Sequence, residues 1–271
     1  MSVDPAQPYG PLVRTRLRVI TWNVWARFGP WRERQVALEE VLADLDPDLV
    51  ALQESWADED GHVGEGRSQA AELGKRLGLA YAKSAGTWSC AVLSRWPIIR
   101  REERSLPGGS MPGRALLTEI DGPRGQIQLI STMIGSFRLD ESEIRQQQVR
   151  SLAGFAAGAM RRRSPLLVCG DFNAGPDSDE IRMLTGRTAP AAPGIVFYDA
   201  WEIAGDGGPG YTWSNENPWA APGLYPDRRF DYVFSAWPRP GGAGHPLRCE
   251  VIGTGTPPPS DHYGLLAELR Y

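Results

Sequence analysis

Short apolar runs separated by turn residues recur along most of the chain, and they predict more strands than helices. Runs without polar alternation, such as Leu49–Leu52 and Leu166–Val168, are typical of strands covered on both faces. Further strands are predicted at Leu17–Trp22, Leu79–Lys83, Trp88–Ser94, Arg114–Ile120, Gln126–Thr132, Phe230–Phe234, Arg248–Gly253 and Gly264–Leu269. Because fully apolar and alternating strands both occur, the pattern favours two packed sheets with helices outside them.

Helical periodicity is found in three segments. The first is Arg32–Leu45, which Pro47 terminates. Its buried face is predicted to carry Val36, Val41, Leu42 and Leu45. The second helix runs from a cap at Ser68 to residue 77, and the third ends near residue 160 after a capping box formed by Asp140 and Glu143. The long segment after Asp171 is rich in glycine and proline and is expected to be irregular.

The length and composition are those of a chain that buries a large core. With 271 residues, 41% of them hydrophobic, the chain is expected to form an extended lead-in over residues 1–15 and one domain over residues 16–271. Its three cysteines are widely spaced and predict no disulfide framework. The amino-terminal segment has no signal-peptide pattern, and no apolar run reaches membrane-spanning length. We therefore expect a cytoplasmic monomer without a membrane span.

The charge balance bears on the class of substrate. The net charge of −4 provides no basic field for a polyanion, so nucleic acid is possible as a partner but not favoured. The one basic run, residues 161–163, falls at the end of a predicted helix, where cations suit the helix dipole. A small phosphate ester would not need such a field.

Polar side chains follow several of the apolar runs, at the point where each predicted strand ends. They are Asn23, Glu54, the pair Asp171 and Asn173, and the pair Asp261 and His262, with Asp231 inside an aromatic strand. Burying a polar group is costly unless it is bonded or used. Each residue taken alone is compatible with a structural role, such as satisfying backbone donors in a turn. Together they predict one polar site at the strand ends.

The chemistry of this set is dominated by oxygen. Carboxylate and amide oxygens suit Mg²⁺ or Mn²⁺, and three histidines in the whole chain are too few for a multi-histidine zinc or di-iron centre. Neither a G-x-S-x-G elbow nor a Cys–His signature is present, so a covalent serine or cysteine mechanism has no support. An acid beside an amide suits phosphoryl chemistry, in which one group activates water and another holds a phosphate oxygen.

These strand ends belong to short motifs in a fixed order. The motifs are Thr21–Val24, Asp46–Glu54, Ala91–Pro97, Gly170–Ala174, Tyr211–Trp213, Arg229–Phe234 and Ser260–His262. In this order they resemble the endonuclease/exonuclease/phosphatase superfamily, which has the deoxyribonuclease I-like fold. The resemblance implies an α/β (α+β) protein, a four-layer α/β/β/α sandwich of two mixed β-sheets flanked by helices. It places the site where the loops of the sheets meet.

The resemblance also implies a role for each polar residue. Glu54 is the principal metal carboxylate for Mg²⁺ or Mn²⁺, with Asn23 and Asp261 beside it. Asp171 orients or deprotonates the attacking water, and Asn173 holds a phosphate oxygen. His262 contacts the phosphate and either acts as a base or stabilises the pentacovalent charge, with Asp231 orienting its other nitrogen. Apart from the resemblance, the basic side chain of Arg114 is a candidate for binding substrate.

One position departs from the family pattern. Many members carry a histidine after the strand predicted at Gln126–Thr132, where it bonds the phosphate or protonates the leaving group. Met133 stands there in this chain, and the downstream pattern Arg145-x-x-Gln148-x-x-x-Leu152 supports that alignment. A thioether is neither an acid nor a useful donor. Loss of a general acid typically costs about 10²–10⁴-fold in rate.

Three functional hypotheses follow from these observations. The first is a metal-dependent hydrolase of small phosphodiesters or phosphomonoesters that uses in-line attack by water. The second keeps this chemistry but makes DNA or RNA the substrate of an endo- or exonuclease. The third is a catalytically weakened protein that binds a phosphate ligand, since Met133 replaces the usual histidine. The loops Ser105–Gly113 and Pro190–Trp219 are expected to shape the pocket, with Trp201, Trp213 and Trp219 available to stack a ring.

Overall fold

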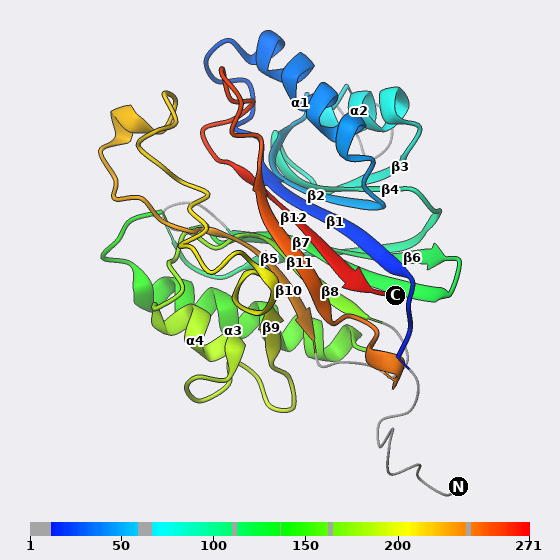
Figure 1. Ribbon diagram of the computed structural model, residues 1–271. Helices are drawn as coiled ribbons and strands as arrows, with labels where there is room; N and C mark the ends of the chain where they lie inside the picture. Colours follow the sequence, from blue (N-terminus) through cyan, green and yellow to red (C-terminus); the bar gives the residue numbers. More distant parts are fainter. Residues whose placement is uncertain (1–11, 59–66, 110–112, 136, 162–164, 237–239) are drawn as a thin grey trace, which may run out of the picture.

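The structure is a computed structural model and describes residues 12–58, 67–109, 113–135, 137–161, 165–236 and 240–271. Two six-stranded sheets form its centre (Figure 1). The first contains β1 (Arg16–Asn23), β2 (Leu49–Trp56), β3 (Ala80–Lys83), β4 (Trp88–Ser94), β11 (Pro246–Ile252) and β12 (Gly264–Arg270), in the order β11-β12-β1-β2-β4-β3. The second contains β5 (Ile98–Leu106), β6 (Gly113–Gly122), β7 (Gly125–Met133), β8 (Leu166–Asp171), β9 (Phe197–Asp199) and β10 (Asp231–Ala236), in the order β5-β6-β7-β8-β10-β9.

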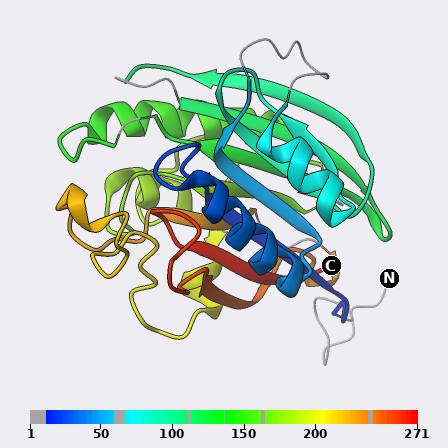
Figure 2. The same ribbon diagram turned by 90° about the horizontal axis from the view of Figure 1, so that it is seen from above.

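Helices cover the outer faces of the two sheets, which confirms the predicted four-layer sandwich. The helices α1 (Trp31–Leu45) and α2 (Gln69–Leu77) lie on the first sheet, while α3 (Ser142–Ala159) and α4 (Asp179–Thr185) lie on the second (Figures 1 and 2). Shorter helical segments are α5 (Ala200–Ala204), η1 (Ala221–Gly223) and η2 (Pro240–Gly242). No helix in the described part of the chain is long and apolar enough to span a membrane.

Three separate hydrophobic clusters correspond to the three boundaries between these layers. Leu38 and Leu42 of α1 pack with the outer face of the first sheet. Leu17, Leu129 and other alternate residues of both sheets fill the space between the sheets. A third cluster lies between the second sheet and α3 and α4. Strands buried on both faces have no polar face, which explains their continuous apolar runs.

The topology brings the predicted polar strand ends to one edge. The strands β1 and β2 are parallel, with Asn23 paired to Gln53, and β7 and β8 are parallel, with Met133 paired to Asp171. Parallel neighbours end at the same edge of a sheet, so residues that follow them in the sequence gather there. The two sheets contact each other through β1, β2, β7, β8 and β10.

Two details of the predicted helices were wrong. Val36 is 51% exposed, because α1 instead turns Arg34, Gln35, Leu38 and Leu42 toward the sheet. The third helix is α3, which begins after Glu141 and has no side-chain cap. The carboxylate of Asp140 does not cap it, because both its oxygens accept hydrogen bonds from Arg138.

Regular structure also occurs where none was predicted. The edge strand β5 was missed because most of its side chains are exposed and charged, which hides the apolar alternation. The glycine- and proline-rich region after Asp171 contains α4, β9 and α5. These elements are seven residues or fewer, too short to give a clear period. The strand predicted to end at Leu52 continues to Trp56.

Candidate active site

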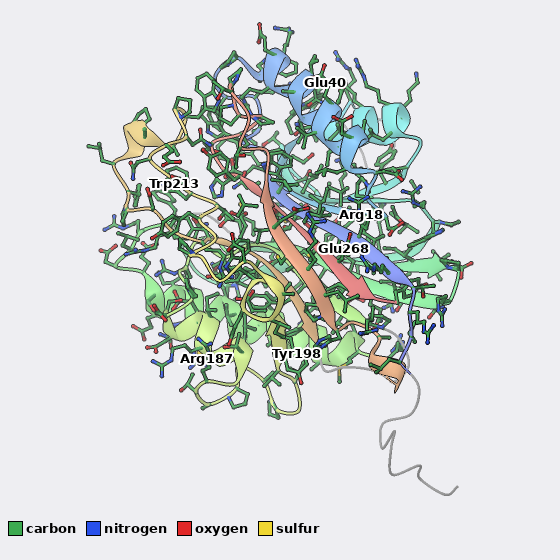
Figure 3. All side chains as sticks on the ribbon, viewed as in Figure 1. Arg18, Glu40, Arg187, Tyr198, Trp213 and Glu268 are labelled. Atoms are coloured by element: carbon green, nitrogen blue, oxygen red, sulfur yellow. The ribbon has the colours of Figure 1, made fainter. Side chains whose placement is uncertain are left out.

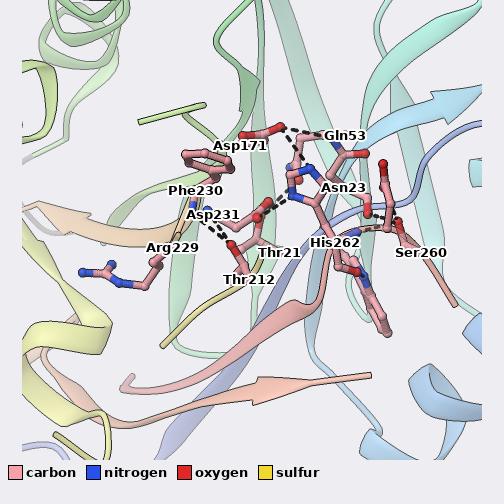
Figure 4. A network of polar contacts seen from close by, with 12 residues as sticks. Thr21, Asn23, Gln53, Asp171, Thr212, Arg229, Phe230, Asp231, Ser260 and His262 are labelled. Carbon is pink, nitrogen blue, oxygen red and sulfur yellow. Dashed lines mark hydrogen bonds and ion pairs between the residues drawn. The ribbon is translucent and has the colours of Figure 1, made fainter. Parts of the chain in front are cut away.

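Asn23 joins the two sheets where β1 and β8 end. Its Nδ2 group donates one hydrogen bond to Asp171 Oδ2, at 3.1 Å (Figure 4). It donates another to Glu54 Oε1, at 3.2 Å. Its Oδ1 atom accepts the backbone N–H of Trp25 at 3.1 Å. This buried amide therefore fixes two carboxylates from different sheets relative to each other.

Local irregularities of the backbone position the two carboxylates. The pairing of β2 with β4 shifts register between Leu52 and Ser55, and Glu54 in this bulge has a φ of 51°. Such a bulge re-aims a side chain away from the regular pleat. Ahead of Asp171, a Cβ on Gly170 would lie 1.9 Å from the Thr132 carbonyl oxygen. Glycine at this position is required by the close approach of β7 and β8.

Asp171 also orders the turn that follows β8. Its Oδ1 atom accepts the backbone N–H of Asn173 at 2.8 Å. Asn173 has a φ of 49°, a left-handed conformation that asparagine tolerates better than most residues. The Asn173 side-chain amide donates to the Ile134 carbonyl at 2.9 Å. Since this amide carries two N–H groups, one remains for a ligand.

His262 and Asp231 form a buried pair beside Asp171. His262 Nδ1 lies 2.8 Å from Asp231 Oδ2, and His262 Nε2 lies 4.0 Å from Asp171 Oδ2 (Figure 4). The backbone N–H of Asp231 donates to the Thr212 hydroxyl at 3.1 Å. The ring of Trp213 packs edge-on against His262, with centroids 5.1 Å apart. The imidazole is thereby held between an acid and an indole.

Burial and charge shift the pKa of Asp171, Asp261, Glu54 and His262. Burial raises the pKa of Asp171 to about 7 and that of Asp261 to about 6, although the nearby His262 charge opposes both shifts. Burial also raises the pKa of Glu54. For His262, burial lowers the pKa, but the charges of Asp231 and Asp171 carry it well above its ordinary value. The charged form of His262 is therefore favoured, with Nδ1–H donating to Asp231.

The donor set fits a divalent cation. Glu54 and Asp261 are close enough for the charge of Glu54 to raise the pKa of Asp261, and both feel the charge of Arg34. Arg34, however, donates all its described hydrogen bonds to carbonyl groups, so it neutralises neither acid directly. Glu54 is half-buried and Asp261 is buried, and neither carboxylate forms an ion pair with a described residue, so the pair favours a bound metal ion.

A second group of ligand atoms lies next to this pair. One ligand atom each from Asp171, Asp231 and His262 falls within 4.8 Å of the others, and Asp231 Oδ1 is buried without a hydrogen-bond partner among the described residues. A protonated His262 already balances part of this negative charge. We therefore regard Glu54 and Asp261 as the better cation ligands, with one Asn23 Oδ1 lone pair still free.

The site opens into one cavity of about 380 Å³, and Asn23 and Asp231 lie behind the residues that line it. Glu54, Asp171, Asn173, Asp261 and His262 contribute its polar part. The apolar part consists of Trp25, Phe28, Trp88, Met133, Ile134, Phe137, Trp213, Tyr225 and Phe230. Figure 3 shows Trp213 on the loop side of the sandwich, away from the facing pair Arg18 and Glu268 on β1 and β12. The cavity thus combines a compact acidic floor with aromatic walls.

Arg34 supports this cavity and was not recognised from the sequence. The side chain is 4% exposed and donates to the carbonyls of residues 24, 25, 26, 28 and 259. It thereby connects the loop after β1 with the segment that carries Asp261. The sequence did contain an indication that Arg34 is buried. Residues 34, 38 and 42 share one face of a helix, and Arg34 is the charged residue on this otherwise apolar face. Asn217, whose amide donates to the carbonyls of Ser260 and Asp261, gave no such signal.

Some residues named from the sequence lie elsewhere. Arg114 does not line the cavity, and its guanidinium donates to the Ala85 carbonyl at 2.7 Å. Trp201 is packed into the core between the sheets, so Trp213 is the tryptophan of the predicted loop that reaches the cavity. Trp219 contacts the cavity wall from behind, with its ring 6.0 Å from that of Trp25.

Met133 lies directly beside Asp171. The two residues are paired in the parallel register of β7 and β8, so their side chains share one face of the sheet. Met133 is 5% exposed and lines the cavity. The position at which the family resemblance predicts a histidine is therefore inside the site, but the side chain of Met133 provides no proton donor.

Comparison with known proteins shows what the chain is similar to. Among curated proteins, the chain is similar to Protein angel from Drosophila melanogaster, with 26% identity over 210 residues that cover 71% of this chain. These residues are 57% of the length of that protein, so the chain spans little more than half of it.

Solved structures show the same fold. The structure of D. rerio TDP2 complexed with single strand DNA product has a TM-score of 0.75 at 21% identity, covering 95% of this chain and all of that one. An endonuclease/exonuclease/phosphatase from Bacteroides vulgatus has a TM-score of 0.72 at 17% identity, covering 94% of this chain and 99% of that one. The sequence profile described as "Endonuclease/Exonuclease/phosphatase family" matches residues 20–262, from the middle of β1 to His262. The chain therefore belongs to the Endonuclease/Exonuclease/phosphatase family.

Proposed function

We propose that this protein is a divalent-metal-dependent hydrolase that cleaves small phosphodiesters or phosphomonoesters by in-line attack of water. Membership of the family supports a metal-dependent phosphoester hydrolase in general terms. The observation that carries the proposal is the gathering of Glu54, Asp171, Asp261 and His262 in one cavity from three separate segments. Chance placement of structural polar residues does not explain why all four face the same space.

Asp171 is proposed to activate the water. Its pKa of about 7 places it close to the ideal value for a general base at neutral pH. Asn23 Nδ2 and the Asn173 backbone N–H each bond one of its oxygens, which fixes the direction of the remaining lone pairs. The free N–H of the Asn173 side chain would hold a phosphoryl oxygen next to that water.

His262 is proposed to stabilise the charge that develops on the phosphoryl group. Its Nδ1–H donates to Asp231, which leaves Nε2–H on the opposite side of the ring for a phosphoryl oxygen. The buried Asp231 carboxylate keeps the imidazole charged and correctly turned. Asp231 is thus proposed as a positioning residue, whereas His262 touches the reacting group.

Glu54 and Asp261 are proposed to hold Mg²⁺ or Mn²⁺, with Asn23 beside them. When bound there, the metal ion would supply Lewis-acid stabilisation of phosphoryl oxygen charge. The residues of the chain then share the remaining tasks of aiming water and holding phosphate oxygens.

A nuclease activity has one observation in its favour, the likeness of the fold to that of D. rerio TDP2 complexed with single strand DNA product. Three arginines whose charge would otherwise attract a polynucleotide backbone do not strengthen it, because neighbouring side chains engage each of them. Arg95 pairs with Asp46 and Asp48, Arg100 pairs with Glu102 and Glu119, and the Arg104 guanidinium stacks on Phe155. Small esters therefore remain the preferred substrates, with polynucleotides as the alternative.

The experiment is hydrolysis of a panel of phosphate esters, with and without Mg²⁺ or Mn²⁺, by the wild type and Glu54→Gln. We expect metal-dependent turnover that falls by at least about 10²-fold in the variant. Glu40→Gln removes an exposed carboxylate on α1 and is the matched control (Figure 3). Single-stranded DNA belongs in the same panel, because a polynucleotide substrate would show binding that weakens steeply with salt.

Two outcomes would count against the proposal. Equal turnover by the wild type and Glu54→Gln would remove Glu54 from the site chemistry. Tight binding of phosphate ligands without turnover of any ester would favour the alternative of a catalytically weakened protein, in which Met133 has replaced an essential acid.

A further inference from the structure

Exposed aromatic side chains are concentrated at the mouth of the cavity. Among the described residues, five aromatic side chains are exposed, namely Phe28, Tyr81, Trp88, Phe137 and Tyr211. Three of these, Phe28 at 42%, Trp88 at 40% and Phe137 at 48%, line the one cavity that contains the acidic site. Scattered exposed rings are ordinary, but a group of them beside a polar site is typical of ligand binding.

The rings are arranged as a wall and do not form a closed core. Phe28 meets Trp88 edge-on, with ring centroids 5.4 Å apart, and Trp25 lies 5.9 Å from Phe28. Phe28 comes from the loop after β1 and Trp88 from β4, so two distant segments build one surface. Despite these contacts, about two fifths of Phe28 and of Trp88 still faces outward. Aromatic rings have directional faces and edges, which remain available to a further ring here.

The loop that presents Phe28 is held in an unfavourable conformation. Trp25 and Ala26 have φ values of 53° and 35°, in the left-handed region that these residue types rarely adopt. The buried Arg34 stabilises this loop conformation, because its guanidinium donates hydrogen bonds to the carbonyls of residues 24, 25, 26 and 28. Strain that the surroundings enforce is most often found at ligand sites.

The charge of the lining restricts the ligand. No lysine or arginine is among the described residues that line the cavity, and His262 is its one basic side chain. A polynucleotide backbone, with a charge at each nucleotide, finds no counter-charges there beyond the single phosphate position. A ligand with one phosphate and one flat apolar group fits this lining. The phosphate suits the acidic residues once they hold a cation, and the flat group suits the aromatic side chains.

We infer that Phe28, Trp88 and Trp25 form a subsite for an aromatic ring attached to the scissile phosphate. This inference rests on the proposed function, because it places the phosphate over Glu54, Asp171 and His262. The ring belongs either to an aryl ester or to the base of a single nucleotide, and the shared chemistry is a planar ring within reach of the phosphate. Met133, a polarisable side chain on the cavity wall, adds a favourable sulfur contact to such a ring.

Equilibrium binding tests the subsite without requiring turnover. In the presence of Mg²⁺, calorimetry on the full chain would compare inorganic phosphate, methyl phosphate, hexyl phosphate, phenyl phosphate and a nucleoside 5′-monophosphate. We expect phenyl phosphate or the nucleotide to bind about tenfold more tightly than methyl phosphate, a gain in line with stacking on two rings. Whichever of the two binds better identifies the source of the ring.

Substitutions locate the effect. Phe28→Ala and Trp88→Ala should each reduce the preference for the ring-bearing ligand to about threefold or less, leaving the affinity for inorganic phosphate unchanged. Phe28→Leu keeps apolar bulk without a ring and should behave like Phe28→Ala. Tyr81→Ala, an exposed aromatic on β3 outside the cavity, should keep the full preference. Thermal unfolding of each variant verifies that it is folded.

The outcomes separate this inference from the proposed function. Equal binding of methyl and phenyl phosphate, or a preference that survives in both alanine variants, overturns the ring subsite while the phosphate site stands. Hexyl phosphate binding as tightly as the aromatic ligands overturns it in favour of an apolar chain. Absence of Mg²⁺-dependent binding of inorganic phosphate overturns the phosphate site and, with it, the inference.

Discussion

Replacement of Arg34 by methionine should destabilise the protein through loss of one buried network. The guanidinium makes six hydrogen bonds of 2.8–3.2 Å to five backbone carbonyls, and it is 4% exposed. Methionine replaces the aliphatic part of the arginine side chain but has no donors, so these carbonyls lose their partner in a space that water does not easily reach.

The magnitude follows from the value of such bonds. A hydrogen bond from a charged donor contributes about 1.5–3 kcal/mol net, but bonds from one side chain do not add independently. Three of the six bonds are buried at both ends. We therefore expect the free energy of unfolding to fall by about 4 kcal/mol. For a chain of this size, that corresponds to a decrease in Tm of roughly 10 °C.

The assay is urea-induced unfolding followed by circular dichroism, together with thermal unfolding. Arg32→Met is the matched control, because Arg32 lies two residues away on α1, is exposed, and only stacks on Trp31. It should cost less than about 1 kcal/mol. Arg34→Lys should recover a minor part of the loss, since an ammonium cannot reach five separate carbonyls. A change below 1 kcal/mol in Arg34→Met would refute the reasoning that this network holds the loop.

Three further substitutions test other parts of the site. Asp231→Asn should lower kcat by about 10²–10⁴-fold with little change in KM, because it removes the charge that keeps His262 protonated and turned; a loss under tenfold would contradict this role. Met133→His should narrow the rate difference between aryl and alkyl leaving groups, and identical leaving-group dependence in both proteins would show that the position does not supply an acid. Gly170→Ala should reduce the unfolding free energy by about 3 kcal/mol in a urea titration, since its Cβ would clash with the Thr132 carbonyl; an unchanged midpoint would mean that β7 and β8 separate easily.

The sequence by itself determined which segments form the buried strands and which polar residues follow them. Apolar runs such as those of β2 and β8 report burial of each strand directly, because a strand with two covered faces carries few polar side chains. The ordered motifs around Glu54, Asp171 and His262 also identified the family and its fold. Charged, exposed β5 escaped notice, because an edge strand has no such pattern.

Only the tertiary structure decided how these residues meet. The bridge from Asn23 to Glu54 and Asp171 depends on the packing of two sheets, and no local period encodes a distance between sheets. The partners of Arg34 were likewise not predictable from the sequence. The helical pattern places Arg34 on the buried face of α1, but its five carbonyl partners lie on two separate loops. Arg114 was expected near substrate, yet the structure directs it to Ala85. Periodicity reports the environment of one element, whereas a site is made of side chains that several elements bring into one space.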